Sequence, residues 1–443
     1  MRGRRGASFE SAGLTFLVVA AIAFASIVIT SAPARATPAD AFGVGPRAQA
    51  MGNTGVASLD GTTAAFYNAA ALAAAEHPSL LLSYNFGHLA LELSGRDPNI
   101  LDMRGFELSG VFPLRLARDW TLAVGGGLHL PDQFIARIQL LPATEPHFVM
   151  WDNRVHRIVV QLGASVRWRN LLAFGVGASL FADASGNGLQ FRIDSLPGRT
   201  IADAALDVEL PIRAAPIAGL LVSPRPWLRF GLRYRGELSL DLALDIVALA
   251  RIPGTSIAGD VIISVRGTDY YTPAEVAGGA EVDVGPLTLA AELAWHRWSD
   301  LPIVASDVAL LIRLGVEPST VQAAFPDPTY DDILIPRLGA SWRIDLPRRR
   351  TLMARAGWWY ERSPVPDQTG ITSFADNNRH VTTLGGALSF PDFGFPFTIE
   401  AAFQAHWMVE RQTAKVERLS PVGDFVSSGQ VYFVSLGLRA EIP

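Results

Sequence analysis

The sequence contains no cysteine among its 443 residues. Disulfide frameworks, thiolate zinc sites and cysteine nucleophiles are therefore excluded. Charged residues are also scarce at 18%, whereas a typical soluble domain carries about 25%. The formal net charge is −5 and the sequence has no basic tract, so we do not expect nucleic acid as a partner.

Long apolar runs are missing as well. After residue 36, the sequence has no uncharged apolar run of the roughly eighteen residues that a transmembrane helix needs, which excludes a helical membrane protein. Nevertheless, 49% of the residues are hydrophobic and the mean hydropathy is +0.24. A transmembrane β-barrel accounts for both observations, because it spreads its lipid-facing apolar residues over alternate positions.

Residues 1–36 have the features of a secretory signal peptide. Arg2, Arg4 and Arg5 give a positive start, residues 14–30 are apolar, and a small-x-small cleavage pattern ends at Ala36. An uncleaved membrane anchor is the alternative, because this apolar stretch approaches the length that spans a bilayer. We expect export with cleavage of this segment.

Many later segments alternate apolar and polar residues, as strands with one apolar and one polar face do. In residues 397–407 every odd position is apolar, whereas Thr398, Glu400 and Gln404 occupy even positions. Residues 287–295 repeat this pattern, with apolar residues at the odd positions. A soluble β-sandwich shows the same alternation, so the pattern by itself predicts strands and not the fold.

The links between these segments favour a membrane barrel. Short turns and long links alternate strictly along the chain, as periplasmic turns and external loops do in bacterial barrels with an even number of strands. Four tryptophans lie beside the short turns, where an interfacial aromatic girdle is expected: Trp120, Trp168, Trp227 and Trp342. We predict about fourteen antiparallel strands, which begin near residues 79, 101, 119, 153, 171, 204, 227, 268, 286, 332, 350, 379, 396 and 428.

Two segments depart from this pattern. Residues 37–77 are rich in alanine and glycine and do not alternate. A barrel of this size would enclose a water-filled channel unless something fills it, so the segment is either a plug or a periplasmic extension. The link 242–267 is long and apolar, which is compatible with an extra hairpin above the membrane.

Residues 42–76 closely resemble the N-terminal hatch of the FadL/TodX family of outer-membrane transporters for hydrophobic compounds. The similarity lies in the glycine-containing stretch 52–57 and in residues 67–72, where the family has Tyr-Asn-Pro-Ala-Gly-Leu. Ala69 and Ala71 replace the family's proline and glycine, which puts its tight turn in doubt. The resemblance implies that residues 37–77 form a luminal hatch with these gate residues: Gly52, Asn53, Gly55, Phe66, Tyr67 and Asn68.

Later segments are similar to the same family and follow in the same order. Residues 295–300 match a strand that ends in Trp-Ser, and residues 357–367 with 376–379 match two loop motifs. The resemblance implies structural roles for Trp298, Ser299, Ser363, Pro364, Asp376 and Arg379. It further implies a monomeric barrel over residues 78–443, in contact with outer-membrane lipid and lipopolysaccharide. Such a barrel binds a fatty acid or an aromatic hydrocarbon and releases it sideways.

The predicted external loop 132–152 is unusually apolar for a solvated segment. It either collects the ligand or forms a lid with a small core of its own. Three arginines at positions expected to face the lumen, Arg337, Arg343 and Arg355, either pair with a ligand carboxylate or with luminal acids such as Asp345 and Glu400. The candidate ligand-binding residues are Phe134, Leu140, Leu141, Phe148, Met150, Trp151, Arg337 and Arg355.

Together, these features predict an outer-membrane protein for passive uptake of hydrophobic compounds, with long-chain fatty acids as the expected class. We expect no cofactor, no metal site and no enzymatic activity, because the eight histidines are scattered without metal-ligand spacing and no nucleophile elbow occurs. Two alternatives stay open: a docking component of a protein secretion or attachment system, and a barrel enzyme that acts on lipids.

Overall fold

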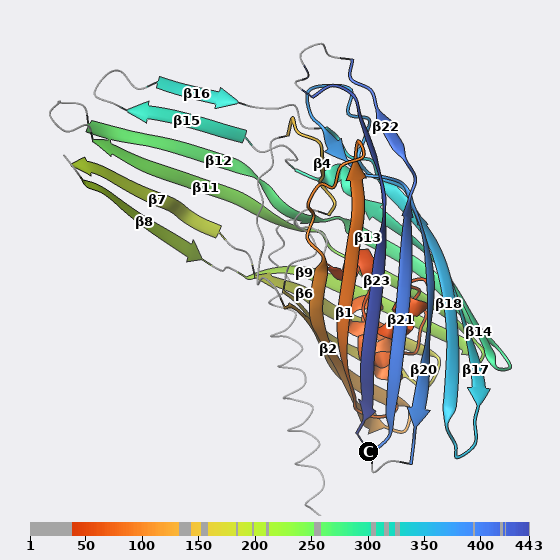
Figure 1. The fold of residues 1–443 in the computed structure, drawn as a ribbon. Coiled ribbons are helices and arrows are strands. Elements are labelled where there is room, and N and C mark those ends of the chain that lie inside the picture. The colour runs from red at the N-terminus through yellow and green to blue at the C-terminus, as the bar shows by residue number, and fades with distance from the viewer. Residues whose placement is uncertain are drawn as a thin grey trace, which may run out of the picture.

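The predicted fold class is confirmed: fourteen antiparallel strands form a closed transmembrane barrel (Figure 1). They belong to a fifteen-stranded sheet in which the first strand pairs with the last long one, and the short β22 (Arg411–Thr413) adds at the rim. Within the described part of the chain, no helix is long and apolar enough to cross a membrane. The computed structural model describes residues 38–132, 143–151, 158–182, 185–196, 199–209, 212–251, 258–302, 307–313, 319–323, 328–392, 395–416, 420 and 422–442.

Most predicted strand starts agree with the structure within three residues. The starts predicted near 204 and 268 are wrong, because strands outside the barrel occupy those residues, and the start predicted near 153 lies outside the described residues. In order around the barrel, the wall strands are β1 (Ser79–Leu93), β2 (Met103–Ala117), β3 (Trp120–Pro131), β5 (Val159–Trp168), β6 (Leu172–Ala182), β9 (Ile212–Arg225), β10 (Leu228–Arg235), β13 (Ala274–Val284), β14 (Leu287–Arg297), β17 (Ile333–Asp345), β18 (Thr351–Glu361), β20 (Arg379–Phe390), β21 (Phe397–Met408) and β23 (Phe425–Glu441).

The outer surface of the wall is apolar. On β21, Ile399 and Phe403 are exposed while Glu400 and Gln404 face the lumen and are buried. Leu384, in the middle of β20, is 60% exposed. Because about 25 cal/mol is lost per Å² of apolar surface left in water, a continuous band of such residues is stable only in a lipid environment.

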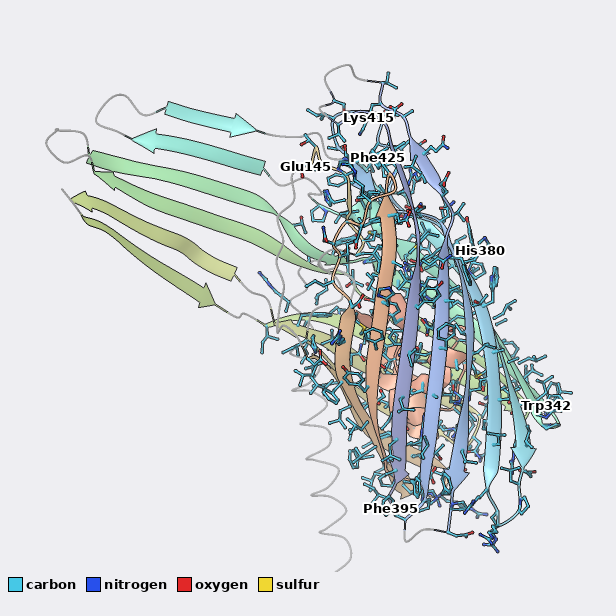
Figure 2. All side chains as sticks on the ribbon, viewed as in Figure 1. Glu145, Trp342, His380, Phe395, Lys415 and Phe425 are labelled. Atoms are coloured by element: carbon cyan, nitrogen blue, oxygen red, sulfur yellow. The ribbon has the colours of Figure 1, made fainter. Side chains whose placement is uncertain are left out.

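Aromatic residues mark one end of this apolar band. Trp342 and Phe395 lie at the end of the short turns, which is the lower end of the barrel in Figure 2. Glu145, Lys415 and Phe425 lie at the opposite end, among the long loops. Since tryptophan favours the membrane–water interface, the position of Trp342 agrees with the predicted girdle beside the short turns.

Three of the long loops form a second sheet beyond the barrel rim (Figure 1). The predicted extra hairpin is confirmed as the pair β11 and β12, and β11 also pairs in parallel with β7, with Ile246 opposite Leu189. Across this external sheet the order is β16 (Ser319–Ala323), β15 (Asp307–Arg313), β12 (Ala258–Thr272), β11 (Leu238–Arg251), β7 (Ser185–Leu196) and β8 (Arg199–Glu209).

Residues 38–75, the inner segment, lie inside the barrel and contain no strand (Figure 1). Two of its short helices are capped by side chains: Asp60 accepts a hydrogen bond from the amide of Thr62, and Asn68 accepts one from the amide of Ala70. Its helices are α2 (Pro38–Phe42), α3 (Pro46–Ala50), η1 (Gly61–Thr63), α4 (Ala64–Tyr67) and η2 (Ala69–Ala74).

Candidate functional site

Polar side chains of the wall hold the backbone of the inner segment. The Gln404 amide on β21 donates a hydrogen bond to the carbonyl of Phe42 at 2.9 Å. The Thr383 hydroxyl on β20 donates to the carbonyl of Ala50 at 2.8 Å and accepts from the amide of Gly52 at 3.0 Å. Because unpaired backbone groups are costly to bury, these bonds fix the inner segment at a defined height in the lumen.

Glu292 on β14 binds the middle of the inner segment. One carboxylate oxygen accepts hydrogen bonds from the amides of Gly55 at 3.0 Å and Val56 at 3.1 Å. The other oxygen accepts from Arg337 of β17 at 2.7 Å. The arginine therefore balances the charge of a carboxylate whose second oxygen is bonded to the inner segment.

Asn68 joins two parts of the inner segment to the wall. Its amide nitrogen donates to the carbonyl of Val56 at 2.7 Å and to the carbonyl of Leu220 on β9 at 3.0 Å. Asn68 itself is fully buried. A side chain without both a donor and an acceptor cannot make this set of contacts.

The other predicted gate residues also lie inside the lumen and are buried. The Tyr67 hydroxyl accepts a hydrogen bond from the amide of Val44 at 2.9 Å and donates to the Asn53 side chain at 3.3 Å. The carbonyl of Phe66 accepts from Arg233 of β10 at 3.1 Å. The structure thus brings these residues together, while their role as a gate stays a prediction.

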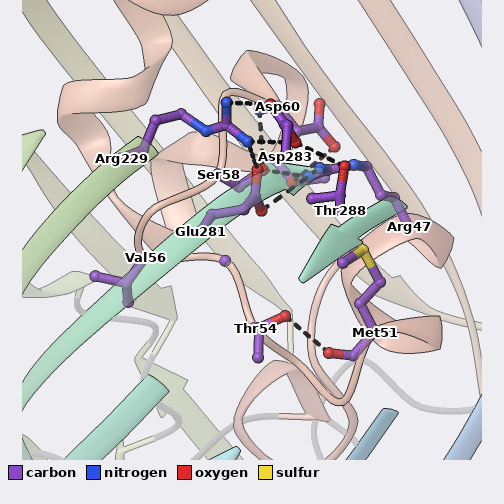
Figure 3. Close-up of polar contacts among 12 residues, drawn as sticks. Arg47, Met51, Thr54, Val56, Ser58, Asp60, Arg229, Glu281, Asp283 and Thr288 are labelled. Carbon is purple, nitrogen blue, oxygen red and sulfur yellow. Dashed lines mark hydrogen bonds and ion pairs between the residues drawn. The ribbon is translucent and has the colours of Figure 1, made fainter. Parts of the chain in front are cut away.

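Figure 3 shows ion pairs between the inner segment and the wall strands. Arg47 lies 3.8 Å from Glu281, and Glu281 also pairs with Arg229 at 2.7 Å. Asp60 pairs with Arg439 of β23 at 2.6 Å. Burial alone would raise the pKa of Asp60, but Arg439 and Arg47 outweigh burial and hold this pKa below its usual range.

Glycines in the wall give the inner segment the space that it occupies. A Cβ atom at Gly231 on β10 would lie 1.9 Å from the carbonyl oxygen of Val56. A Cβ atom at Gly357 on β18 would lie 2.1 Å from the amide nitrogen of Gly52, and Gly52 itself has a φ of +66°. Only glycine permits the close backbone approach at these two wall positions.

An aromatic cluster forms where an external loop meets the inner segment. The Phe42 ring stacks on Phe433 of β23 at 4.5 Å and lies 6.0 Å from Trp151 of the loop. His406 packs edge-on against Phe42 at 5.4 Å and against Trp359 at 5.5 Å. Side chains from a loop, the inner segment and three wall strands therefore share one apolar core.

The apolar external loop contributes to this core. Phe148 and Trp151 are each 1% exposed and Met150 is nearly buried, so these three predicted ligand residues are brought together. Their burial places them in the core shared with the inner segment and the wall, and both ligand contact and a lid role stay predictions. Three further predicted ligand residues lie outside the described residues: Phe134, Leu140 and Leu141.

Two residues with implied structural roles lie on η3 (Trp298–Asp300), just after β14. Trp298 is buried and packs against Tyr271 at 5.5 Å and Tyr330 at 6.3 Å. The amide of Ser299 donates to the Asp332 carboxylate at 2.9 Å. Their packing and hydrogen bonds stabilise the rim at this point and bring no ligand group into the lumen.

The second motif connects β18, β20 and β21 at the rim. Ser363 donates its amide to Asn378 at 2.9 Å, and Pro364 accepts a hydrogen bond from the amide of Asp331 at 2.9 Å. Arg379 pairs with Glu361 at 2.6 Å. Further contacts of this motif are the Arg379 guanidinium over the Trp151 ring at 5.0 Å and the Asp376 carbonyl, which accepts from Arg411 at 3.3 Å.

The two arginines predicted to contact ligand differ in their surroundings. Arg337 is paired with Glu292 and lines the cavity beside α2. Arg355 on β18 is 8% exposed and lies opposite Ser341 and Gly385 on the neighbouring strands. Ligand contact by either arginine stays a prediction.

Small cavities surround α2. One, of about 10 Å³, is bounded by Phe42, Val44 and a mixture of apolar and polar wall residues, among them Glu107. A second, of about 20 Å³, is bounded by Asp40 and several charged wall residues. Ligand pockets usually measure roughly 300–1,000 Å³, so the cavities beside α2 cannot admit a drug-sized molecule while α2 is in place.

Several residues at this site did not stand out in the sequence. Glu292 and Gln404 lie at even positions of strands whose odd positions are apolar, so alternation marked them as luminal but did not show their partners. Asp40 and Phe42 carried no signal of this kind, because the inner segment does not alternate.

The comparisons with known proteins support the fold. No family model matches the chain. Alkane uptake protein A of Marinobacter nauticus is 22% identical over 210 residues, which cover 46% of this chain and 43% of that protein. The match thus spans less than half of the length of this curated relative.

Solved structures match over most of the chain. A FadL homologue of Pseudomonas aeruginosa has a TM-score of 0.51 at 14% identity, with 92% of this chain and 98% of that chain covered. The toluene transporter TodX of Pseudomonas putida has a TM-score of 0.54 at 16% identity, with 89% and 97% covered. The toluene transporter TbuX of Ralstonia pickettii has a TM-score of 0.51 at 16% identity, with 91% and 99% covered. The resemblance to FadL/TodX barrels is therefore confirmed at the level of the fold.

Proposed function

We propose that this protein carries hydrophobic small molecules across the outer membrane of a Gram-negative cell by passive diffusion. The observation behind the proposal is the aromatic cluster of Phe42, Trp151 and Phe433, because it joins an external loop, the inner segment and the wall in one apolar contact. An apolar solute held at the loop can move along such a surface without entering water. The names of the alkane and toluene proteins point to the same class of cargo.

The inner segment acts as the gate in this proposal. The cavities around α2 are too small for cargo, so passage requires this part of the inner segment to move. Gly52, Gly55 and Asn68 lie at its attachment points on the wall. Sideways release into the bilayer then needs no energy source, since apolar surface leaves water at a gain of about 25 cal/mol per Å².

The loop residues Phe148, Met150 and Trp151 are the proposed surface that collects the ligand. Long-chain fatty acids are the expected cargo, and aromatic hydrocarbons or alkanes are further hydrophobic molecules of the proposed cargo class. The protein works as a monomer in this proposal, because one chain closes the whole barrel.

Uptake of radiolabelled oleate and hexadecane into cells that express the protein tests the proposal. We expect Trp151→Ala to slow uptake of at least one of them, because the loop then loses its contact with Phe42. Trp342→Ala is the matched control, since Trp342 is 49% exposed on the outer wall and lies at the end of the short turns. Wild-type uptake equal to that of cells without the protein would refute the function.

Organic extracts of the folded, detergent-purified protein provide an independent measurement. A fatty acid or another apolar metabolite identified by mass spectrometry would support transport. An extract without apolar ligand, together with a stoichiometric protein partner, would instead support a docking role.

A further inference from the structure

The two faces of the external sheet differ in composition. Alternate residues of a strand belong to the same face, so the register between strands shows which residues share it. One row crosses all six strands and consists of aliphatic residues: Leu206, Leu189, Ile246, Ile263, Leu310 and Val321. The rows two residues to either side of it hold leucine, isoleucine, valine, alanine, phenylalanine and a single serine. We call the face that these three rows share the apolar face.

The charged residues of the same part of the sheet lie on the opposite face. The register there places residues of opposite charge across from each other in three pairs: Arg192 with Asp203, Asp260 with Arg313, and Arg266 with Asp307. Such pairs suit a face that is in contact with water. An antiparallel sheet with one polar and one apolar face is stable when the apolar face is packed against another element.

The described part of the chain provides no such element. There the strands of the external sheet contact mainly one another, and β11 also contacts β9 of the wall. Figure 1 shows that the six strands project sideways from the barrel rim and are stacked along the barrel axis, with β8 nearest the short turns and β16 farthest from them. Both faces of the sheet therefore stand upright on the membrane, whereas a face that binds a lipid surface would lie parallel to it.

The base of the sheet is fixed to the rim. Leu238, at the start of β11, is buried in a cluster with Phe181 of β6 and Ala215 of β9. Tyr271, near the end of β12, is buried and packs against Trp298 at 5.5 Å. Because the remaining strands pair onto β11 and β12, the barrel presents the apolar face in a defined orientation.

The edges of the sheet are protected against pairing with another chain, whereas the apolar face is not. The edge strand β16 has only five residues, and the other edge strand, β8, carries three acids and one arginine. Short and charged edge strands oppose edge-to-edge association.

The size of the sheet is sufficient for a specific interface. With strands about 4.8 Å apart and a rise of about 3.3 Å per residue, the six strands cover about 1,000 Å². A specific protein interface buries about 800 Å² on each partner.

We propose that the apolar face binds the apolar face of a second copy of this chain, so that two complete barrels are joined through their external sheets. Two copies in one membrane have the same orientation, so the two-fold axis that relates them is parallel to the barrel axis. An upright face can meet its own copy across such an axis, and two sheets pack face to face about 10 Å apart. One chain still closes each barrel, so the transport unit is unchanged and the inference goes beyond the proposed function.

Sedimentation equilibrium of the full-length protein in density-matched detergent tests the interface. We expect the wild type to form dimers and Ile263→Lys to raise the dissociation constant at least about a hundredfold, because a symmetric interface would bury the unpaired charge twice. Ile262→Lys is the matched control, since it makes the same change at the neighbouring residue of β12 on the opposite face. Its dissociation constant should stay within about threefold of that of the wild type.

Cross-linking in outer membranes gives a second measurement that needs no charged variant. The sequence has no cysteine, so Ile246→Cys places a single thiol on the apolar face and Val247→Cys places one on the opposite face. We expect a short bismaleimide to join two chains of Ile246→Cys into a species of twice the chain mass, and to leave Val247→Cys as single chains. This measurement decides the question if Ile263→Lys does not give a heat-modifiable folded barrel.

Three results would overturn the inference. They are the absence of a cross-linked dimer with Ile246→Cys, equal dissociation constants for Ile263→Lys and Ile262→Lys in folded proteins, and a cross-link from Ile246→Cys to a different protein, which would then be the partner of this face. None of these results bears on uptake of oleate or hexadecane, so failure of the dimer and failure of the proposed function are distinguishable.

Discussion

Removal of the Glu292 carboxylate should detach the inner segment from the wall. Glu292 accepts hydrogen bonds from two backbone amides, those of Gly55 and Val56, and carries the charge that balances Arg337. Glu292→Ala leaves the two amides without their acceptor and leaves the arginine without its partner. We therefore expect the inner segment of this variant to leave its closed position far more often than in the wild type.

The size of the effect follows from the two backbone contacts. A hydrogen bond to a charged group contributes about 1.5–3 kcal/mol, so the pair contributes about 3–6 kcal/mol. Water that enters the space replaces part of this energy, and we therefore use the lower end, about 3 kcal/mol. At about 1.4 kcal/mol per factor of ten, the population of the displaced state rises about a hundredfold.

Swelling of liposomes in a small sugar measures the leak that results. We expect Glu292→Ala to admit the sugar at a rate well above that of the wild type. Glu361→Ala is the control, because Glu361 is a luminal carboxylate paired with Arg379 within the wall. Equal swelling rates for Glu292→Ala and the wild type, with both proteins folded, would contradict the view that this carboxylate holds the gate.

Three other changes test separate parts of the structure. Gly231→Val places a side chain where the Val56 carbonyl lies and should increase protease cleavage within the inner segment. Gly278→Val on β13 should leave cleavage unchanged, because no atom lies closer than 4.0 Å to its Cβ position. Asn68→Ala removes two hydrogen bonds to carbonyls and should lower the unfolding free energy in urea by about 1–3 kcal/mol. Asn170→Ala, in an exposed turn, should have little effect. Leu384→Arg in mid-wall should lower the free energy of unfolding in vesicles by about 2–4 kcal/mol, and Leu346→Arg beside a short turn by about 0–1 kcal/mol. Equal losses of free energy for the two variants would contradict the assigned membrane position.

The wall strands could be predicted because their information is local. In residues 397–407 and 287–295, alternation alone assigned each residue to the lipid or the lumen, and Ile399, Leu289 and Glu292 lie as it predicts. The contrast between short and long links then separated a membrane barrel from a sandwich. Both signals need only neighbouring residues, so one sequence is sufficient to detect them.

The partners of the inner segment could not be predicted in the same way. The contact of Gly231 with Val56, and that of Gly357 with Gly52, join residues far apart in the chain. Neither the composition nor the alternation of apolar and polar residues specifies which glycine of the wall faces which turn of the inner segment.

The external sheet was missed for a related reason. The hairpin of β11 and β12 is local and was expected, whereas the parallel pairing of β11 with β7 joins two different loops. Parallel pairing leaves no turn signal between its strands, since the strands are connected through other elements. The wrong strand start near residue 204 has the same origin, because β8 has the composition of a wall strand and lies outside the wall.

The order of the external sheet sets a limit on how far the barrel can extend. In the wall, β9 lies between β6 and β10, whereas in the external sheet β7 lies between β8 and β11. The two halves of that hairpin thus exchange places between the sheets, so the β6–β9 ladder cannot continue into the external sheet, whereas the β10–β13 ladder continues in register into β11–β12. The rim therefore has a topological stop beside β6 and β9, while the neighbouring pair β10 and β13 extends past the rim as β11 and β12.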